Sequence, residues 1–151
     1  MIIDTTYLLP LARIDVDVDL LKASVEGRVN VRIEEMAVSL ISLFELQAKA
    51  AKLGVASSIV HEALEAINKA FRVIPFYTKE IVEVSFSLRK TMPDYVDCVI
   101  LATAIVLGEN LVTEDSLIHT KRDLIEKEYR VKVYDFSSLL KKNLDDCNFL
   151  V

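Results

Sequence analysis

Residues 94–115 read DYVDCVILATAIVLGENLVTED, and this stretch decides the fold class. Its first part, residues 94–107, predicts a strongly apolar helix, and Gly108 is a favourable residue at which to end it. A short apolar strand is predicted directly afterwards, at residues 110–113. A buried helix that leads at once into a short buried strand is typical of parallel sheets covered by helices on both faces.

The rest of the chain repeats this alternation of helices and short apolar strands. Further strands are predicted at residues 1–4, 72–76 and 131–136. Further helices are predicted at residues 43–53, 57–71 and 116–129, and a last short helix starts at Ser137 or Ser138. Short strands alternating with longer helices predict an α/β fold with a central parallel sheet.

Two segments are less clear, and one helix start has two candidates. Residues 13–36 alternate in polarity in places, which allows strand or irregular structure. Residues 78–90 fit both a strand and a helix, and we favour a helix because Thr78 can cap it. Ser57 and Ser58 are both suitable caps for the helix that follows them.

Composition is consistent with one domain over residues 1–151. The chain has 52% hydrophobic residues but only 3 glycines and 3 prolines, which disfavours a turn-rich sandwich. Two cysteines do not make a disulfide framework, so we expect a reduced, cytoplasmic protein. We also expect no leader segment and no membrane span. The net charge of −5 gives no global reason to expect nucleic acid as a partner.

Four acidic residues stand apart from the other acids. Asp4 and Asp115 each follow a predicted strand, where sites form in α/β sheets. Glu45 and Asp97 stand in apolar helical stretches, where a lone carboxylate is costly unless it is paired or bound to a cation. Asp94 precedes Asp97 by three residues and shares its helix face.

Each of these acids also has a purely structural explanation. Asp4 and Asp115 are suitable helix caps, and Glu45 and Asp97 could face solvent. Taken together, however, carboxylates without a His or Cys motif suit a hard cation such as Mg²⁺ or Mn²⁺. Such ions support phosphodiester hydrolysis, because they activate water and stabilise the leaving oxygen.

The chain resembles PIN-domain proteins, most closely the VapC-like ribonuclease toxins. Four segments carry the resemblance in the family's order: residues 2–6 (IIDTT), 42–46 (SLFEL), 97–104 (DCVILATA) and 111–115 (LVTED). The last two are the most specific. The resemblance covers nearly the whole domain and implies a three-layer α/β/α sandwich with a central parallel sheet.

The resemblance also assigns roles to individual residues. Asp4 and Asp97 match the family's main metal ligands, while Glu45 and Asp115 match acids that complete the metal shell or orient the attacking water. Thr6 and Thr113 match supporting residues of the family, and Asp94 is the candidate substitute for a further acid that many members carry after the last motif. At position 114, where family members often carry Arg or Asn for a phosphate contact, this chain has Glu114.

By resemblance we expect a Mg²⁺- or Mn²⁺-dependent endoribonuclease that acts on RNA as the toxin of a type II toxin–antitoxin pair. The expected partners are a small antitoxin, whose basic tail enters the acidic site, and a second copy in a homodimer. A housekeeping PIN nuclease and a non-catalytic PIN interaction module remain alternatives.

Other motifs are given structural interpretations. Asp15, Asp17 and Asp19 resemble a calcium loop, but Leu20 stands where that loop needs glycine. His61 and His119 lack metal-ligand spacing, and we expect surface roles for both. Cys98 is expected to be an inert core thiol.

Overall fold

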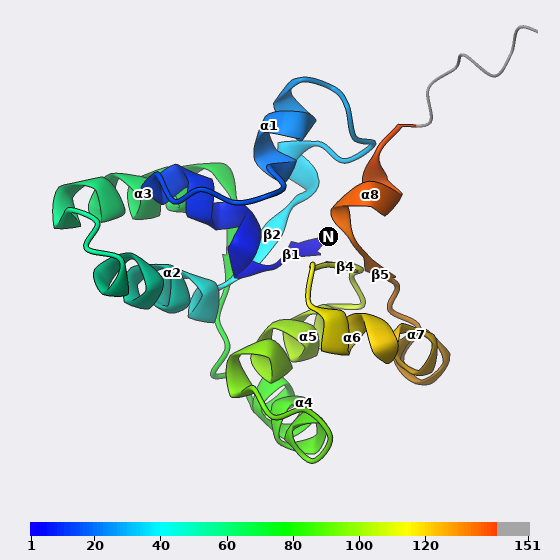
Figure 1. The fold of residues 1–151 in the computed structure, drawn as a ribbon. Helices are drawn as coiled ribbons and strands as arrows, with labels where there is room; N and C mark the ends of the chain where they lie inside the picture. The colour runs from blue at the N-terminus through cyan, green and yellow to red at the C-terminus, as the bar shows by residue number, and fades with distance from the viewer. Residues whose placement is uncertain (142–151) are drawn as a thin grey trace, which may run out of the picture.

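A parallel sheet forms the centre of the computed structural model, which describes residues 1–141 (Figure 1). The five strands lie in the order β3-β2-β1-β4-β5, and every neighbouring pair is parallel. Their bounds are β1 (Ile2–Ile3), β2 (Ala37–Ser39), β3 (Arg72–Ile74), β4 (Leu111–Val112) and β5 (Val133–Tyr134). The predicted α/β fold with a parallel sheet is therefore confirmed.

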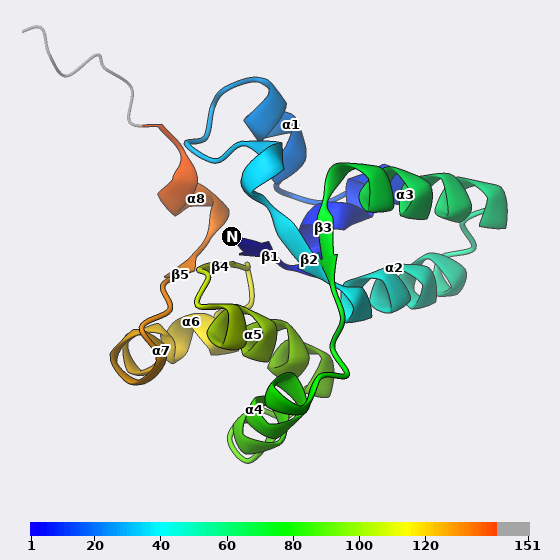
Figure 2. The same ribbon diagram turned by 180° about the vertical axis from the view of Figure 1, so that it is seen from behind.

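Helices cover both faces of the sheet, as Figures 1 and 2 show from opposite sides. The first half of the chain contributes η1 (Thr5–Ala12), α1 (Leu20–Val25), η2 (Ile33–Glu35), α2 (Leu40–Lys52) and α3 (Ser57–Ala70). The second half contributes α4 (Lys79–Arg89), α5 (Tyr95–Leu107), α6 (Ser116–Thr120), α7 (Arg122–Tyr129) and α8 (Phe136–Leu139). No helix within residues 1–141 combines the length and apolarity needed to cross a membrane.

The two hydrophobic cores follow from the alternation of side chains along the strands. Ile3 and Val112 face a core built with η1, α1, α2 and α3. Their neighbours Ile2 and Leu111 face the opposite core, built with α4, α5, α6 and α7. Because successive side chains point to opposite faces, two-residue strands suffice to join the layers into one sandwich.

The stretch that decided the fold class forms the helix and strand predicted for it. Asp94 caps α5, since its Oδ1 accepts hydrogen bonds from the backbone of Val96 and Asp97. Gly108 ends the helix at φ 62°, a left-handed conformation that glycine adopts without steric cost. The preference for a helix at residues 78–90 is also confirmed, as α4 occupies this segment.

Several local predictions are wrong. The helix predicted at residues 116–129 is two helices, α6 and α7, which separate at Lys121. The Lys121 amide bonds back to Ile118, three residues away, which tightens and closes the last turn of α6. Both Ile118 and Ile125 are thereby buried in the same core.

Helix starts were predicted less well than helix interiors. Neither Ser57 nor Ser58 is the cap of α3, which starts after Ala56 without a side-chain cap. Thr78 stands at the start of α4, but its hydroxyl does not cap the helix. The cap of α8 is Asp135 rather than a serine, with Oδ1 accepting from the Ser138 amide at 2.8 Å.

The unclear segment, residues 13–36, contains the short helix α1 instead of a strand. Asp19 caps this helix by accepting from the Lys22 amide at 2.9 Å, which gives it a structural role outside any calcium loop. Strand β2 lies just beyond, in a segment for which the sequence patterns predicted no strand. Cys147 and the last part of the proposed domain, residues 142–151, lie outside the described residues.

Candidate active site

An acidic cavity of about 390 Å³ lies where the carboxyl ends of β1 and β4 meet α2 and α5. Its lining brings together all four predicted acids and two of the predicted supporting residues, Thr6 and Asp94. The third supporting residue, Thr113, is fully buried and bonds to Asp4 from below the lining. We use the name acidic cavity for this lining set: Asp4, Thr6, Glu45, Lys49, Asp94, Asp97, Glu114 and Asp115.

The sheet and two helices create this convergence. Strands β1 and β4 are parallel neighbours with Ile3 opposite Val112, so the residues that follow each strand emerge side by side. Asp4 follows β1, and Asp115 follows β4 by way of Thr113. Helices α2 and α5 approach each other near β1 (Figure 1), and they supply the remaining carboxylates. In α/β folds, binding sites form at the carboxyl ends of the strands.

Asp4 is the most buried acid of the cavity, with 9% of its surface exposed. Its Oδ1 accepts from the Thr5 amide at 2.6 Å, and its Oδ2 accepts from the Thr113 hydroxyl at 2.8 Å. Burial raises the pKa of Asp4 above its ordinary value, and the Thr113 hydrogen bond opposes that rise. The Thr113 hydroxyl also accepts from the Asp115 amide at 3.1 Å, so it connects two of the four acids.

Glu45 has a partner on each carboxylate oxygen. The Thr5 hydroxyl donates to Oε2, and the Lys49 ammonium lies 3.0 Å from Oε1. Thr6, which the resemblance assigns to the support of Asp4, lines the cavity, and it is the neighbouring Thr5 that bonds to both Asp4 and Glu45. Lys49 was missed altogether, although its position four residues after Glu45 on one helix was the available signal.

The pKa of Asp97 is affected by the negative charges of the neighbouring carboxylates. Its pKa is raised from 3.8 to about 7, first by burial and then by the negative charges of Asp4, Asp94, Asp115 and Glu45. The side chain is only partly buried, so its apolar sequence context overstated its burial. Mutual repulsion of this kind is what a bound cation relieves.

Helix capping and cavity lining are compatible roles for these acids. Asp115 caps α6, with Oδ1 accepting from the Ile118 amide at 2.8 Å, and Asp94 caps α5. Asp115 is therefore a helix cap, as its structural explanation predicted, and its carboxylate also lines the cavity. Each cap fixes the carboxylate at a helix N-terminus, where the helix dipole favours negative charge.

Glu114 has a structural task in place of a phosphate contact. Its Oε1 accepts from the Tyr7 hydroxyl at 2.6 Å and from the Phe136 amide at 2.7 Å. Tyr7 is fully buried, and burial together with Glu114 raises its pKa. Glu114 therefore ties η1 to the start of α8 at the cavity wall.

The chemistry of the cavity fits a hard divalent cation. Its potential ligands are carboxylate oxygens, which Mg²⁺ and Mn²⁺ prefer, and the negative charges around Asp97 add to the effect of burial in raising its pKa. Among residues 1–141, no three His, Cys, Asp or Glu side chains are already clustered tightly enough to hold an ion. The residues placed to contribute are Asp4, Glu45, Asp97 and Asp115.

The remaining candidate residues have structural roles. Cys98 is fully buried, which confirms its predicted place in the core, and burial raises the pKa of its thiol. His61 lies on the surface beside Glu65, as predicted. His119 does more than predicted, because its Nε2 lies 2.6 Å from the Thr113 carbonyl oxygen and supports the end of β4.

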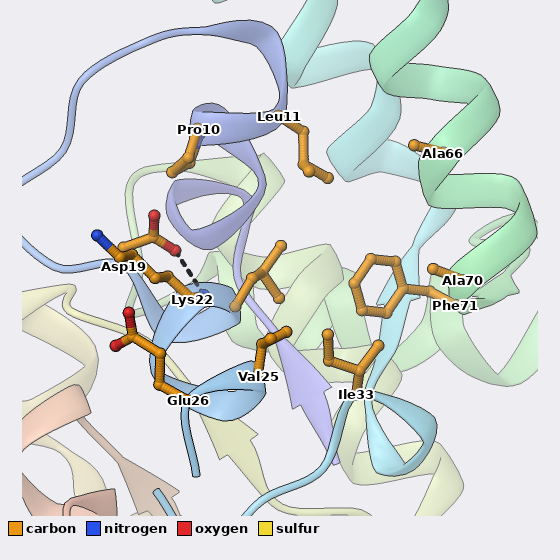
Figure 3. A pocket seen from close by; sticks show the side chains of 11 residues that line it. Pro10, Leu11, Asp19, Lys22, Val25, Glu26, Ile33, Ala66, Ala70 and Phe71 are labelled. Carbon is orange, nitrogen blue, oxygen red and sulfur yellow. Dashed lines mark hydrogen bonds between the residues drawn. The ribbon is translucent and has the colours of Figure 1, made fainter. Parts of the chain in front are cut away.

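A second cavity, of about 460 Å³, has a different character (Figure 3). It lies between η1, α1 and the end of α3, and Leu11, Val25, Ile33 and Phe71 converge on it from these elements and the segment before β2. Its lining is mainly apolar and shares no residue with the acidic cavity. The acidic cavity, and not this one, therefore gathers the predicted metal-binding carboxylates.

Solved structures with the same fold come from bacteria and an archaeon. A structure titled "Toxin-antitoxin complex from Klebsiella pneumoniae" is 23% identical, with a TM-score of 0.53, covering 76% of this chain and 86% of that chain. FitAcB from Neisseria gonorrhoeae is 18% identical, with a TM-score of 0.60 and coverage of 89% and 96%. PAE2754 from Pyrobaculum aerophilum is 20% identical, with a TM-score of 0.56 and coverage of 91% and 84%.

Sequence comparison places the chain more directly. A search of curated proteins gives no match. The family model described as "PIN domain" matches residues 1–124, a span that contains every residue of the acidic cavity. The chain therefore belongs to the PIN-domain family.

Proposed function

We propose that this PIN-domain protein is a Mg²⁺- or Mn²⁺-dependent endoribonuclease and the toxin of a type II toxin–antitoxin pair. The observation that carries the proposal is the convergence of Asp4, Glu45, Asp97 and Asp115 on one cavity at the carboxyl edge of the sheet. Family membership supports nuclease chemistry, and one structure of the same fold is titled as a toxin–antitoxin complex.

In this proposal Asp4 and Asp97 are the main metal ligands, and Glu45 and Asp115 complete the metal shell or orient the attacking water. The bound cation supplies water activation and stabilises charge on the phosphate. The protein contributes position: Thr113 fixes the Asp4 carboxylate, and Thr5 fixes that of Glu45. Asp97 stays partly open to solvent, so a phosphodiester can approach it.

The same cavity is the proposed docking site of the antitoxin. Six carboxylates and one ammonium give its lining a strong negative excess, which favours a basic protein tail. We therefore propose a small antitoxin with such a tail as the partner. We also propose that the protein acts in the cytoplasm and that residues 1–151 form one domain.

A homodimer is also proposed, through the exposed face of α4. Phe86 is 65% exposed and packs edge-on against Tyr95 of α5 with ring centroids 5.9 Å apart, and Val82 lies one turn earlier. Exposed apolar side chains gathered on one helix suit a two-fold interface between identical copies. Sedimentation of the wild type and Phe86→Glu tests this: a dimer that the substitution dissociates supports it, and a monomeric wild type contradicts it.

Incubation with total RNA tests the proposed activity. Purified protein is mixed with RNA in Mg²⁺, in Mn²⁺ and in chelator, and the new ends are sequenced. We expect discrete internal cuts with either ion and none in chelator. Equal cutting in chelator would contradict the metal requirement, and no cutting in any mixture would contradict the nuclease.

Growth separates a toxin from a housekeeping nuclease. Expression of a toxin should arrest growth, and co-expression of its antitoxin should restore it. RNA cleavage without any growth arrest would favour the housekeeping function. If calorimetry detected no binding of Mn²⁺ at all, a non-catalytic interaction module would become the better explanation.

A further inference from the structure

Lys49 is the one cationic side chain among the described residues that line the acidic cavity. It extends from α2, four residues after Glu45, and its Nζ lies 3.0 Å from Glu45 Oε1. The side chain remains 43% exposed. A positive group thus stands at the edge of a lining that otherwise carries carboxylates.

The pair with Glu45 leaves much of the Lys49 ammonium unused. An ammonium has three N–H donors. Among residues 1–141, Glu45 is the one acid with which Lys49 forms an ion pair. Glu45 does not depend on Lys49 for its position, because the Thr5 hydroxyl holds its other oxygen. Partly exposed pairs of this kind contribute little to stability. Stabilising the fold is therefore a poor explanation for Lys49.

A substrate strand poses an electrostatic problem that Lys49 can solve. Every phosphate of RNA is negative, and the cavity that must receive one carries six carboxylates. Cations at the reacting phosphate do not neutralise its neighbours along the strand. Protein contacts to such phosphates come mainly from Lys and Arg, and they set the register of the strand without reading its sequence.

We infer that the Lys49 ammonium binds a non-bridging phosphate oxygen of the RNA strand at the mouth of the acidic cavity, an inference that rests on the proposed nuclease function. The contact orients the strand across the carboxylates. It is independent of base identity, since the ammonium acts as a point charge.

The chain contains a matched control for this inference. Lys52 is the last residue of α2, three positions after Lys49, and it is exposed but does not line the cavity. Lys49→Met and Lys52→Met remove the same charge from the same helix. They differ in whether that charge faces the acidic cavity.

The experiment measures binding of a fluorescent single-stranded RNA by anisotropy, over a series of KCl concentrations in buffer with Mg²⁺. All proteins carry Asp97→Asn so that the RNA stays intact. We expect Lys49→Met to weaken binding about 5- to 20-fold at low salt and to reduce the slope of log affinity against log salt by about 0.7, the value for one single-strand phosphate contact. Lys49→Arg should retain both affinity and slope, and Lys52→Met should change neither.

Three outcomes would overturn the inference. Equal affinity and slope for Lys49→Met and Lys52→Met would show that Lys49 contacts no phosphate. If Lys49→Met had no effect once Glu45→Gln was also present, Lys49 would act only through Glu45. No RNA binding by the Asp97→Asn parent would overturn the proposed function as well, which separates that failure from the other two. Circular dichroism of each variant checks that the fold is retained.

Discussion

The Thr113 hydroxyl donates a 2.8 Å hydrogen bond to Asp4 Oδ2, although the two residues are 109 positions apart in sequence. The register of β1 and β4 makes the contact possible, because Ile3 lies opposite Val112 and each strand ends one residue before the pair. The same hydroxyl accepts from the Asp115 amide. A single side chain thus joins the first and last acids of the proposed site.

Thr113→Val should lower activity without unfolding the protein. The variant keeps the shape of the side chain but removes the hydrogen bond that fixes the Asp4 carboxylate and favours its charged form. Residues that orient metal ligands typically contribute about 10- to 100-fold to metal affinity or activity. We expect a loss of this size in Mn²⁺ affinity by calorimetry and in RNA cleavage.

Thr103→Val is the matched control for that prediction. Thr103 is equally buried, but its hydroxyl bonds to the Val99 carbonyl within α5, away from the cavity. Its substitution should leave Mn²⁺ affinity unchanged. An equal loss in both variants would show that the effect of Thr113→Val comes from packing and not from Asp4.

The four acids and the fold could be predicted from sequence because their signals are local. Asp4 and Asp115 follow apolar strands, and Asp97 interrupts an apolar helix. Parallel topology then brings strand ends together wherever the strands are neighbours. The break at Lys121 could not be predicted, because the periodicity of α6 and α7 is continuous across it and tertiary packing decides the change of direction.

Tyr7→Phe should lower the free energy of unfolding by about 2 kcal/mol, the usual contribution of a hydrogen bond to a charged group. It removes the donor 2.6 Å from Glu114 Oε1 in a fully buried position. Urea denaturation measures the effect. Tyr77→Phe is the control, since Tyr77 is 70% exposed, and it should change stability little. Similar midpoints for the two variants would contradict a stabilising role for the Tyr7–Glu114 bond.

The role of Glu114 illustrates what sequence alone could not provide. Its partners, the Tyr7 hydroxyl and the Phe136 amide, lie more than a hundred positions before it and 22 positions after it. No local pattern indicates such a link. Lys49 was missed for a different reason: its spacing of four residues from Glu45 is an ordinary pattern on a helix surface, and the cavity is what shows its place at the site.

Asp97 should make stability depend on pH when divalent ions are chelated. Its folded pKa of about 7 lies above the ordinary 3.8, so the folded state holds the proton more tightly. The free energy of unfolding should therefore fall as pH rises between these two values. Asp97→Asn removes the titrating group, and its melting temperature should exceed that of the wild type by more at a pH above 7 than at acidic pH.

Thermal melts over a pH series measure this difference. Mn²⁺ provides the complementary readout, because a cation that neutralises the cavity should raise the wild-type melting temperature more than that of Asp97→Asn. If the difference in melting temperature between the two proteins were the same at every pH, the raised pKa of Asp97 would be contradicted. The proposed repulsion from its acidic neighbours, Asp4, Asp94, Asp115 and Glu45, would be contradicted with it.

The most direct test of the central claim compares RNA cleavage by the wild type, Asp97→Asn and Asp123→Asn in Mn²⁺. Asp123 lies on α7 with its side chain 98% exposed, and it does not line the acidic cavity. Both substitutions remove one negative charge from the same domain. We expect Asp97→Asn to abolish the internal cuts and Asp123→Asn to cleave RNA as the wild type does. Undiminished cleavage by Asp97→Asn would contradict this expectation.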